Sequence, residues 1–365
     1  FLASAGMFKH PIAGFLFRHL YCIPIMRPGK DEKVKKVSNK ESFRKSFDHL
    51  AKGGVMFIAP EGGSAMERRL RPLKTGTARI ALGAEEDNDF QLGIHLYPTG
   101  ITYEHPTQCG SRVYIEAGEP IQVADWKEAY LKNPKEAVRD LTCVLEERME
   151  ALIIHTGDEE QDQLLYRLET ILRNDRPLPV DQHYQRSQRL LTKLQSTDKK
   201  NYVEVKEKAN HYRDQLKANQ LTDRGISQQD TSLFSLINLL GWPVWLYGRI
   251  NNLFPYELPR LLAKKLDLYI GYNSTVKILS GTILFPLFYF IQYKLFSYFV
   301  DGPWPLIYLL SLPLSGIGAW LYARHFVPRW EAFQWKRWQK KHPKPAKELL
   351  HLRAELSAYA STVKD

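Results

Sequence analysis

A glycine-rich turn followed by cations is the part of the sequence best suited to chemistry. The turn occupies residues 60–64, after the short apolar run 55–59 and before a predicted helix that starts near Ala78. Four cations follow within seven positions: Arg68, Arg69, Arg71 and Lys74. Glycines let backbone amides approach a ligand, while guanidinium groups and helix N-termini attract anions. The pattern predicts a phosphate-binding site, and an ordinary strand–turn–helix with a solvated basic face is the alternative.

Three sequence blocks surround this turn in a fixed order. They read FKHPIAGFLFRHLYCIPIMR at residues 8–27, PEGGS at 60–64 and HLYPTGITYEHP at 95–106. Together they resemble the glycerophosphate acyltransferase superfamily, over roughly residues 1–125. The GGS and the following LRPLKTGTARIALGA are more similar to the glycerol-3-phosphate/dihydroxyacetone-phosphate branch than to the lysophosphatidate branch. The resemblance implies transfer of an acyl group from a thioester to a glycerol hydroxyl.

The resemblance also implies roles for individual residues. The implied substrate-binding residues are Arg27, Glu61, Gly62, Gly63, Ser64, Arg68, Arg69 and Lys74. Arg27, at the end of IPxxR, matches the phosphate-binding position, and Glu61 holds the glycerol moiety or orders the turn. Ser64 stands where the family usually has an arginine, so we expect Arg68 or Arg69 to substitute. Lys74, at the start of the following helix, matches the corresponding position of the family only loosely.

A second set of residues matches the block that shapes the acyl-donor pocket of the family. These residues are Pro98, Thr99 and Gly100, for which a structural role is equally compatible with the sequence. We expect no metal and no bound cofactor, with acyl-CoA or acyl carrier protein as the co-substrate. His155 precedes a run of carboxylates at 158–160, but in an acidic loop at a helix end, and is not expected to form a site.

The base required by this chemistry is not recognisable in the chain. A hydroxyl becomes a good nucleophile when a base takes its proton, and the family uses a histidine with an aspartate five positions later. None of the eleven histidines has that spacing. The family places this block upstream of FKHP, so we expect it before Phe1 and interpret the acyltransferase domain as truncated. A natural pseudoenzyme is the alternative.

Charge and composition favour an anionic partner at a membrane. The net charge is +11, and aromatic residues make up 12% of the chain, which is typical of proteins at a lipid surface. The three cysteines have no CxxC spacing, so a disulfide framework or a zinc site is not expected. No nucleic-acid module is recognisable, and we expect no nucleic-acid partner.

Strands alternate with helices in the first third, which predicts an α/β fold. We expect residues 1–124 to form the acyltransferase domain, with a central, mainly parallel sheet flanked by helices. Strands are expected at 55–59, 92–97 and 111–116, and a helix at 41–52 capped by Gly53. Residues 125–230 have helical periodicity. They predict a helical accessory region that packs against other parts of the protein and separates them, without a part in the chemistry.

The last third predicts membrane segments. Residues 231–275 suit an interfacial or re-entrant amphipathic segment, since the apolar part is only sixteen residues and is broken by Gly-Trp-Pro. Residues 276–326 predict a transmembrane hairpin with spans at 278–300 and 304–323. The alternative is a buried core hairpin. Residues 327–365 form a basic tail, which by the positive-inside rule faces the cytosol together with the acyltransferase domain.

Three functions are compatible with these observations. The first is an acyltransferase that acts on glycerol 3-phosphate or dihydroxyacetone phosphate, in a bacterial cytoplasmic membrane or endoplasmic reticulum. The second is a lysophosphatidate (1-acylglycerol-3-phosphate) acyltransferase. The third, from another class, is a non-catalytic scaffold that binds lipid phosphates, whose binding would weaken steeply with salt.

Overall fold

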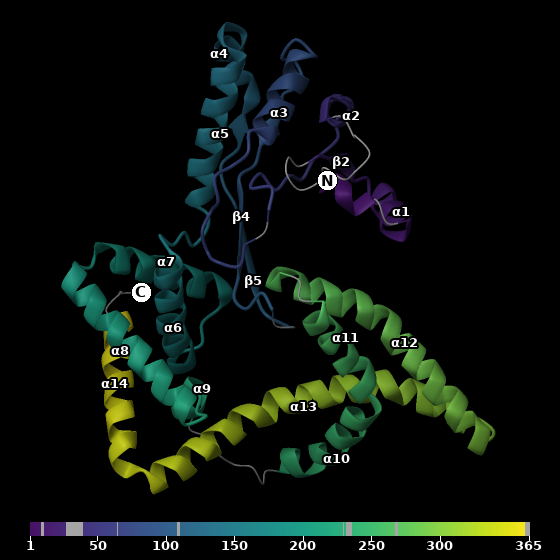
Figure 1. Ribbon diagram of the computed structural model, residues 1–365, viewed down its shortest axis with the longest axis vertical. Coiled ribbons are helices and arrows are strands. Elements are labelled where there is room, and N and C mark those ends of the chain that lie inside the picture. The colour runs from purple at the N-terminus through teal and green to yellow at the C-terminus, as the bar shows by residue number, and fades with distance from the viewer. Residues whose placement is uncertain are drawn as a thin grey trace. The chain divides into compact units, whose positions relative to one another are not determined.

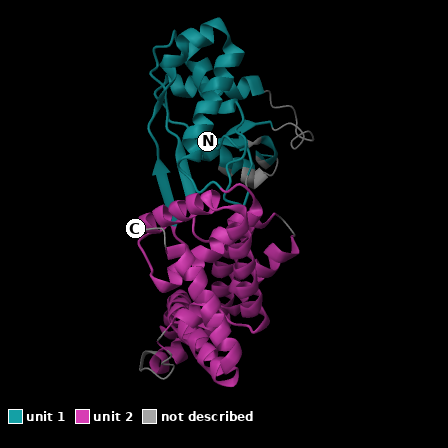
Figure 2. Ribbon diagram, turned by 90° about the vertical axis from the view of Figure 1, so that its left-hand side faces the viewer, with its two compact units in different colours: residues 1–102, 113–155 teal, residues 103–112, 156–365 magenta. Residues whose placement is uncertain are grey.

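The computed structural model describes residues 1–8, 11–26, 39–63, 65–107, 110–228, 230, 236–266 and 269–361. The chain divides into two compact units (Figure 2). Unit 1 comprises Phe1–Thr102 and Val113–His155, and unit 2 comprises Tyr103–Arg112 and Thr156–Asp365. Residues 125–155 therefore belong to the same compact unit as the N-terminal third of the chain.

Unit 1 combines short strands with helices (Figure 1). Its helices are α1 (Pro11–His19), α2 (Asn39–Ala51), α3 (Gly76–Glu86), α4 (Lys127–Lys132), α5 (Pro134–Glu150) and the 3₁₀ turns η1 (Ala5–Phe8) and η2 (Val123–Trp126). Its strands are β1 (Leu2–Ser4), β2 (Ile23–Ile25), β3 (His95–Leu96), β4 (Thr99–Tyr103), β5 (Val113–Ala117) and β6 (Ile121–Gln122). Gly53 follows α2 at φ +76°, as a C-terminal cap requires.

The strands of the described residues pair two by two. β1 pairs with β2 in parallel, β3 pairs with β6 antiparallel, and β4 pairs with β5. At the ends of β4 and β5, hydrogen bonds join Glu104 N to Arg112 O (3.0 Å) and Gly118 N to Pro98 O (2.8 Å). The expected central, mainly parallel sheet is not confirmed, because only β1 and β2 are parallel among these pairs.

The prediction of a strand at residues 55–59 is wrong. These residues have no strand hydrogen bonding, and the side chain of Val55 is 91% exposed. A short apolar run indicates a strand only if another strand pairs with it, and the local sequence does not contain that information. The strands expected at 92–97 and 111–116 are present as β3 and β5.

The core of unit 1 lies between α3, α5 and the strands β3 and β6. It is built from small and branched side chains: Ala78, Ala81, Leu82, Phe90, Ile121, Val123, Val138, Leu141 and Leu145. Glu85 of α3 is fully buried, and its carboxylate accepts hydrogen bonds from Leu92 N (3.2 Å) and Ile94 N (2.6 Å). The buried carboxylate thereby satisfies backbone donors of the loop that leads into β3.

Unit 2 is helical apart from the hairpin tip. Its helices are α6 (Glu159–Asp175), α7 (Val180–Ser196), α8 (Lys199–Ala218), α9 (Asp223–Ser227), α10 (Leu236–Asn251), α11 (Leu253–Lys265), η3 (Ile270–Tyr272), α12 (Asn273–Phe299), α13 (Trp304–Lys341) and α14 (Pro343–Ser361). The last helix, α14, packs on α6 and α8, although it is far from them in sequence (Figure 1). Asp158, Asp198 and Thr222 cap the N-termini of α6, α8 and α9.

Two helices of the described residues are long and apolar enough to cross a membrane. They are Ile270–Phe299 and Trp304–Lys341; no residue in the most apolar stretch of the first is buried, and 11% of those in the second are. Exposure on this scale argues against a buried core hairpin, since a core helix would be covered by other parts of the protein. Helix α13 continues past the expected span to Lys341, so the start of the basic tail is helical.

Candidate phosphate-binding site

The glycine turn folds back on the basic segment that follows it. The N–H of Gly62 donates to Ala59 O (3.2 Å), and the N–H of Lys74 donates to Pro60 O (2.9 Å). Gly62 has φ +65°, in the left-handed region that favours glycine. A Cβ at Gly62 would lie 3.0 Å from Cδ of Lys74, so the lysine side chain passes directly over the turn. The structure therefore brings Gly62 and Lys74 together.

Glu61 holds the turn in place. Its Oε2 accepts a hydrogen bond from the N–H of Arg71, at 3.1 Å. This contact closes a loop of ten residues and fits the expectation that Glu61 orders the turn.

The cations of the segment differ in their partners. Arg69 and Arg71 both form ion pairs with Glu67, with 3.4 Å between Arg69 Nη2 and Glu67 Oε2. Part of their charge is therefore neutralised. Lys74 is exposed, and within the described ranges it has no ion-pair partner. Its ammonium group is the cation of this segment best placed to meet a ligand anion.

Two residues distant in sequence hold the same loop. Oε2 of Glu146, on α5, accepts from the N–H of Leu73 (3.1 Å). Nδ1 of His155 accepts from the N–H of Leu70 (3.3 Å). Sequence reasoning did not assign Glu146 a role and set His155 aside, because neither residue has a local signal that links it to the loop.

The remaining predicted residues stand apart from this cluster or outside the description. Arg27 and Ser64 lie outside the described residues. Arg68 is half-buried. Gly63 is exposed, and a Cβ placed on it would meet open space.

Pro98, Thr99 and Gly100 lie at the start of β4, where the backbone is tightly packed. A Cβ at Gly100 would collide with the carbonyl group of Leu152, in the turn that follows α5. Only glycine permits this approach, which is a structural reason for its position. The role of these residues in an acyl-donor pocket stays a prediction.

The arrangement can bind an anion over the glycine turn, where Lys74 lies. The N–H of Gly62 is already bonded to Ala59 O, so the ammonium group of Lys74 is the group of this turn that suits phosphate oxygens. In the ranges that the structure covers, no group of three or more His, Cys, Asp or Glu side chains could hold a metal ion.

In a comparison with known proteins, residues 1–102 match the family model Acyltransferase. Glycerol-3-phosphate O-acyltransferase 2 of Saccharomyces cerevisiae is 39% identical over 109 residues, which are 30% of this chain and 14% of that protein. Glycerol-3-phosphate O-acyltransferase 1 of the same yeast is 31% identical over 128 residues, 34% of this chain and 17% of that protein. An uncharacterised acyltransferase of Schizosaccharomyces pombe is 30% identical over 113 residues, 30% of this chain and 17% of that protein. The aligned segments thus cover less than a fifth of each relative, and no solved structure matches the chain.

Proposed function

Because residues 1–102 belong to the glycerophosphate acyltransferase superfamily, we propose that this protein is a membrane-bound O-acyltransferase of glycerolipid synthesis. It moves a fatty acyl group from a thioester, acyl-CoA or acyl carrier protein, to a hydroxyl of glycerol 3-phosphate. The names of the two yeast relatives favour glycerol 3-phosphate over lysophosphatidate as the acceptor.

The observation that carries this proposal is the position of Lys74 over the Gly62 turn. In the proposed complex, the ammonium group of Lys74 binds the phosphate of the acceptor. Arg27 is proposed as a second phosphate ligand, and Glu61 orders the turn through Arg71. The histidine–aspartate pair that takes the hydroxyl proton is proposed from the resemblance to the family.

The proposed orientation follows from charge. The stretch from Arg324 to Lys347 has eight Lys or Arg and one acidic residue, Glu331, and it follows the apolar part of α13 directly. Such a segment favours the cytosolic side of a membrane. The acyltransferase domain is proposed to face the same side.

The test is acyl transfer by the natural protein in liposomes, from radiolabelled acyl-CoA to glycerol 3-phosphate. Lys74→Ala is expected to lower kcat/KM by about 10- to 100-fold, mainly through KM for the acceptor, because a hydrogen bond to a charged group is lost. The matched control is Lys52→Ala, an exposed lysine in the turn after α2. Equal losses in the two variants would contradict the proposed site.

The acceptor is decided in the same assay. Preference for lysophosphatidate would assign the protein to the other branch. Binding of lipid phosphates without any acyl transfer would support the non-catalytic scaffold instead.

A further inference from the structure

We propose that α10 and α11 form a re-entrant helical hairpin inside the bilayer. In this arrangement the chain enters from the side of the basic end of α13, turns at Asn251 and Asn252 near the midplane, and returns to the same side. The partner of its exposed apolar surface is the hydrocarbon of the lipid. The proposal rests on α12 and α13 as membrane spans and is independent of the acyl-transfer reaction.

The first argument is the register of α10 against α13. The two helices run antiparallel and approach closely, as shown by four pairs of contacts: Gly241 with Tyr322, Val244 with Gly318, Gly248 with Ser315, and Asn252 with Leu312. A side chain at Gly248 would collide with the carbonyl group of Ser315. Small residues that let backbones approach are typical of helix pairs in membranes.

This register sets the depth of the turn. Leu312 is eight residues from Trp304 and eleven from Ala323, the two ends of the apolar part of α13. At 1.5 Å per residue these separations are ~12 Å and ~16 Å, so Leu312 lies close to the middle of a ~30 Å hydrocarbon core. Asn252 donates a hydrogen bond from Nδ2 to Leu312 O (3.2 Å) and is therefore at the same level.

The second leg of the hairpin is positioned by α12. The rings of Phe254 and Phe288 stack with 6.0 Å between their centroids, and Tyr289 donates from its hydroxyl to Asn252 Oδ1 (2.6 Å). Helix α11 has 13 residues. A helix of that length spans ~20 Å. This is enough to reach from the midplane to the interface, but too short to span the whole hydrocarbon core of ~30 Å. It ends at Lys264 and Lys265, which suit the interface at the basic side.

The turn between α10 and α11 has its polar groups satisfied by the neighbouring helices. Gln292 donates from Nε2 to Asn251 O (3.0 Å), and Tyr308 donates from its hydroxyl to Asn251 Oδ1 (2.7 Å). Asn252 also donates to Gly248 O (2.9 Å) and is only 8% exposed. Non-helical backbone is tolerated at membrane depth where protein groups satisfy it, and this turn meets that condition.

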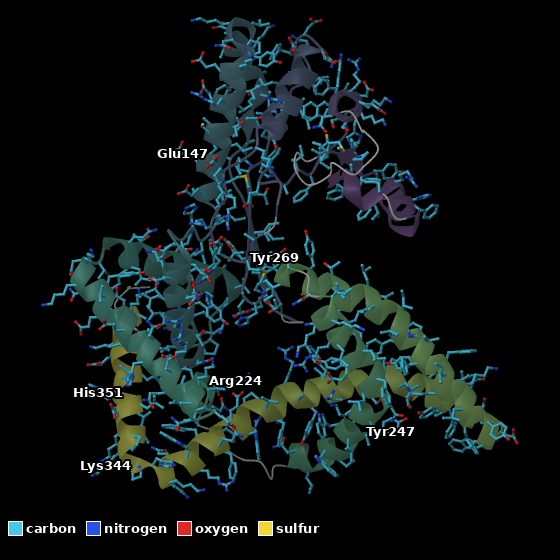
Figure 3. The ribbon with its side chains drawn as sticks, in the orientation of Figure 1. Glu147, Arg224, Tyr247, Tyr269, Lys344 and His351 are labelled. Atoms are coloured by element: carbon cyan, nitrogen blue, oxygen red, sulfur yellow. The ribbon has the colours of Figure 1, made fainter. Side chains whose placement is uncertain are left out.

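The surface of the hairpin fits lipid. Large apolar side chains of α10 and α11 are exposed, among them Leu240, Trp242, Ile250, Phe254, Tyr256 and Leu261. Tyr247 of α10, labelled in Figure 3, is 38% exposed. The charged groups nearest the turn are paired, with 3.1 Å between Arg249 Nη2 and Glu257 Oε1. Pairing lowers the cost of holding them near hydrocarbon.

The experiment is site-directed labelling of the whole chain in sealed liposomes. Single cysteines are introduced into a background in which Cys22, Cys109 and Cys143 are serine. A membrane-impermeant maleimide is applied before and after permeabilisation of the liposomes. The positions are Lys265→Cys and Lys344→Cys for the basic side, Asp301→Cys for the opposite side, and Leu253→Cys for the turn.

The expected result has three parts. Lys265→Cys and Lys344→Cys react from one side, Asp301→Cys reacts from the other side only, and Leu253→Cys stays unreactive until detergent dissolves the bilayer. Reaction of Leu253→Cys from the basic side would overturn the proposal in favour of an interfacial segment. Reaction from the side of Asp301→Cys would show a full crossing and would overturn it as well. Lys265→Cys and Lys344→Cys on opposite sides would also refute it.

A second variant tests the hydrogen bonds that hold the turn between α10 and α11. Asn252→Leu removes the hydrogen bonds to Leu312 O and from Tyr289, so the hairpin opens more often. In detergent micelles, where the bilayer no longer shields the turn, the labelling rate of Leu253→Cys is expected to rise about tenfold. Asn219→Leu, at the C-terminal end of α8 and outside the four helices, is the matched control. No difference between the two variants would contradict the proposed role of Asn252. Acyl transfer is not needed for either readout.

Discussion

The carboxylate of Glu104 holds the tip of the β4–β5 hairpin to helix α6, and Glu104→Gln should release it. Arg112 donates to both carboxylate oxygens from Nε and Nη2, each at 2.9 Å, and Arg173 of α6 donates from Nη1 at 3.1 Å. Arg112 also donates to Leu178 O (2.9 Å), beyond the end of α6. Glutamine keeps the shape of the side chain but removes the charge that both guanidinium groups share.

The magnitude follows from the pKa of Glu104. The hydrogen bond from Arg112 is the main cause that lowers this pKa from 4.5 to about 2, against burial, which raises it, and with help from the charges of Arg112 and Arg173. A shift of this size corresponds to at most about 3.5 kcal/mol. Arg112 is 38% exposed, so solvent screens part of the interaction. We therefore expect Glu104→Gln to cost about 1–2 kcal/mol at pH 7.

Amide hydrogen exchange of α6 is the appropriate assay, because it reports local opening in a chain of several units. Exchange in Glu104→Gln is expected to be about 5- to 30-fold faster than in the wild type at pH 7. A carboxylate whose pKa is lowered by folding stabilises the protein above its unfolded pKa. The contribution therefore disappears as pH falls from 4.5 toward 2, and the ratio of the two exchange rates should approach one.

The control is Glu160→Gln, whose carboxylate pairs with Lys206 at the surface and whose side chain is 70% exposed. Surface pairs of this kind contribute little. If Glu104→Gln and Glu160→Gln changed exchange equally at pH 7, or if the effect of Glu104→Gln did not decline below pH 4.5, the reasoning would be refuted.

Two further variants test other contacts. Arg353→Met leaves Asp223, which is 7% exposed, without its counter-ion on α14. This change should lower the free energy of unfolding of unit 2 by about 3–5 kcal/mol. An unchanged melting curve would contradict this expectation. Gly62→Ala places a methyl group against Lys74 at φ +65°, which costs about 1–2 kcal/mol, and should raise KM for glycerol 3-phosphate. The control is Gly63→Ala, because a Cβ at Gly63 meets open space. If both variants raised KM for glycerol 3-phosphate equally, a special role for Gly62 would be refuted.

Features with a local signal were predictable from the sequence. The helix at 41–52 and its glycine cap correspond to α2 and Gly53, because amphipathic spacing and a left-handed glycine act within a few residues. The apolar stretches of α12 and α13 were recognisable for the same reason, since length and composition decide whether a helix can span a bilayer.

The candidate site was only partly predictable. Glu61, Gly62 and Lys74 lie within fourteen positions, so their proximity follows from one turn. Glu146 and His155 reach the same loop from α5 and the turn beyond it. Because no local pattern links residues that are some 70 or 85 positions apart, their contribution could not be anticipated from the sequence.

The chain alone therefore determined the family resemblance, the helices and the apolar segments, all of which depend on neighbours along the sequence. Tertiary structure alone decided that residues 55–59 lack a strand partner, because pairing depends on a segment elsewhere in the chain. It also decided the register of α10 against α13, which the close approach of Gly248 to Ser315 sets. Sixteen apolar residues can lie on a bilayer or enter it, and the proposal that they enter it rests on contacts with α12 and α13 that the sequence does not contain.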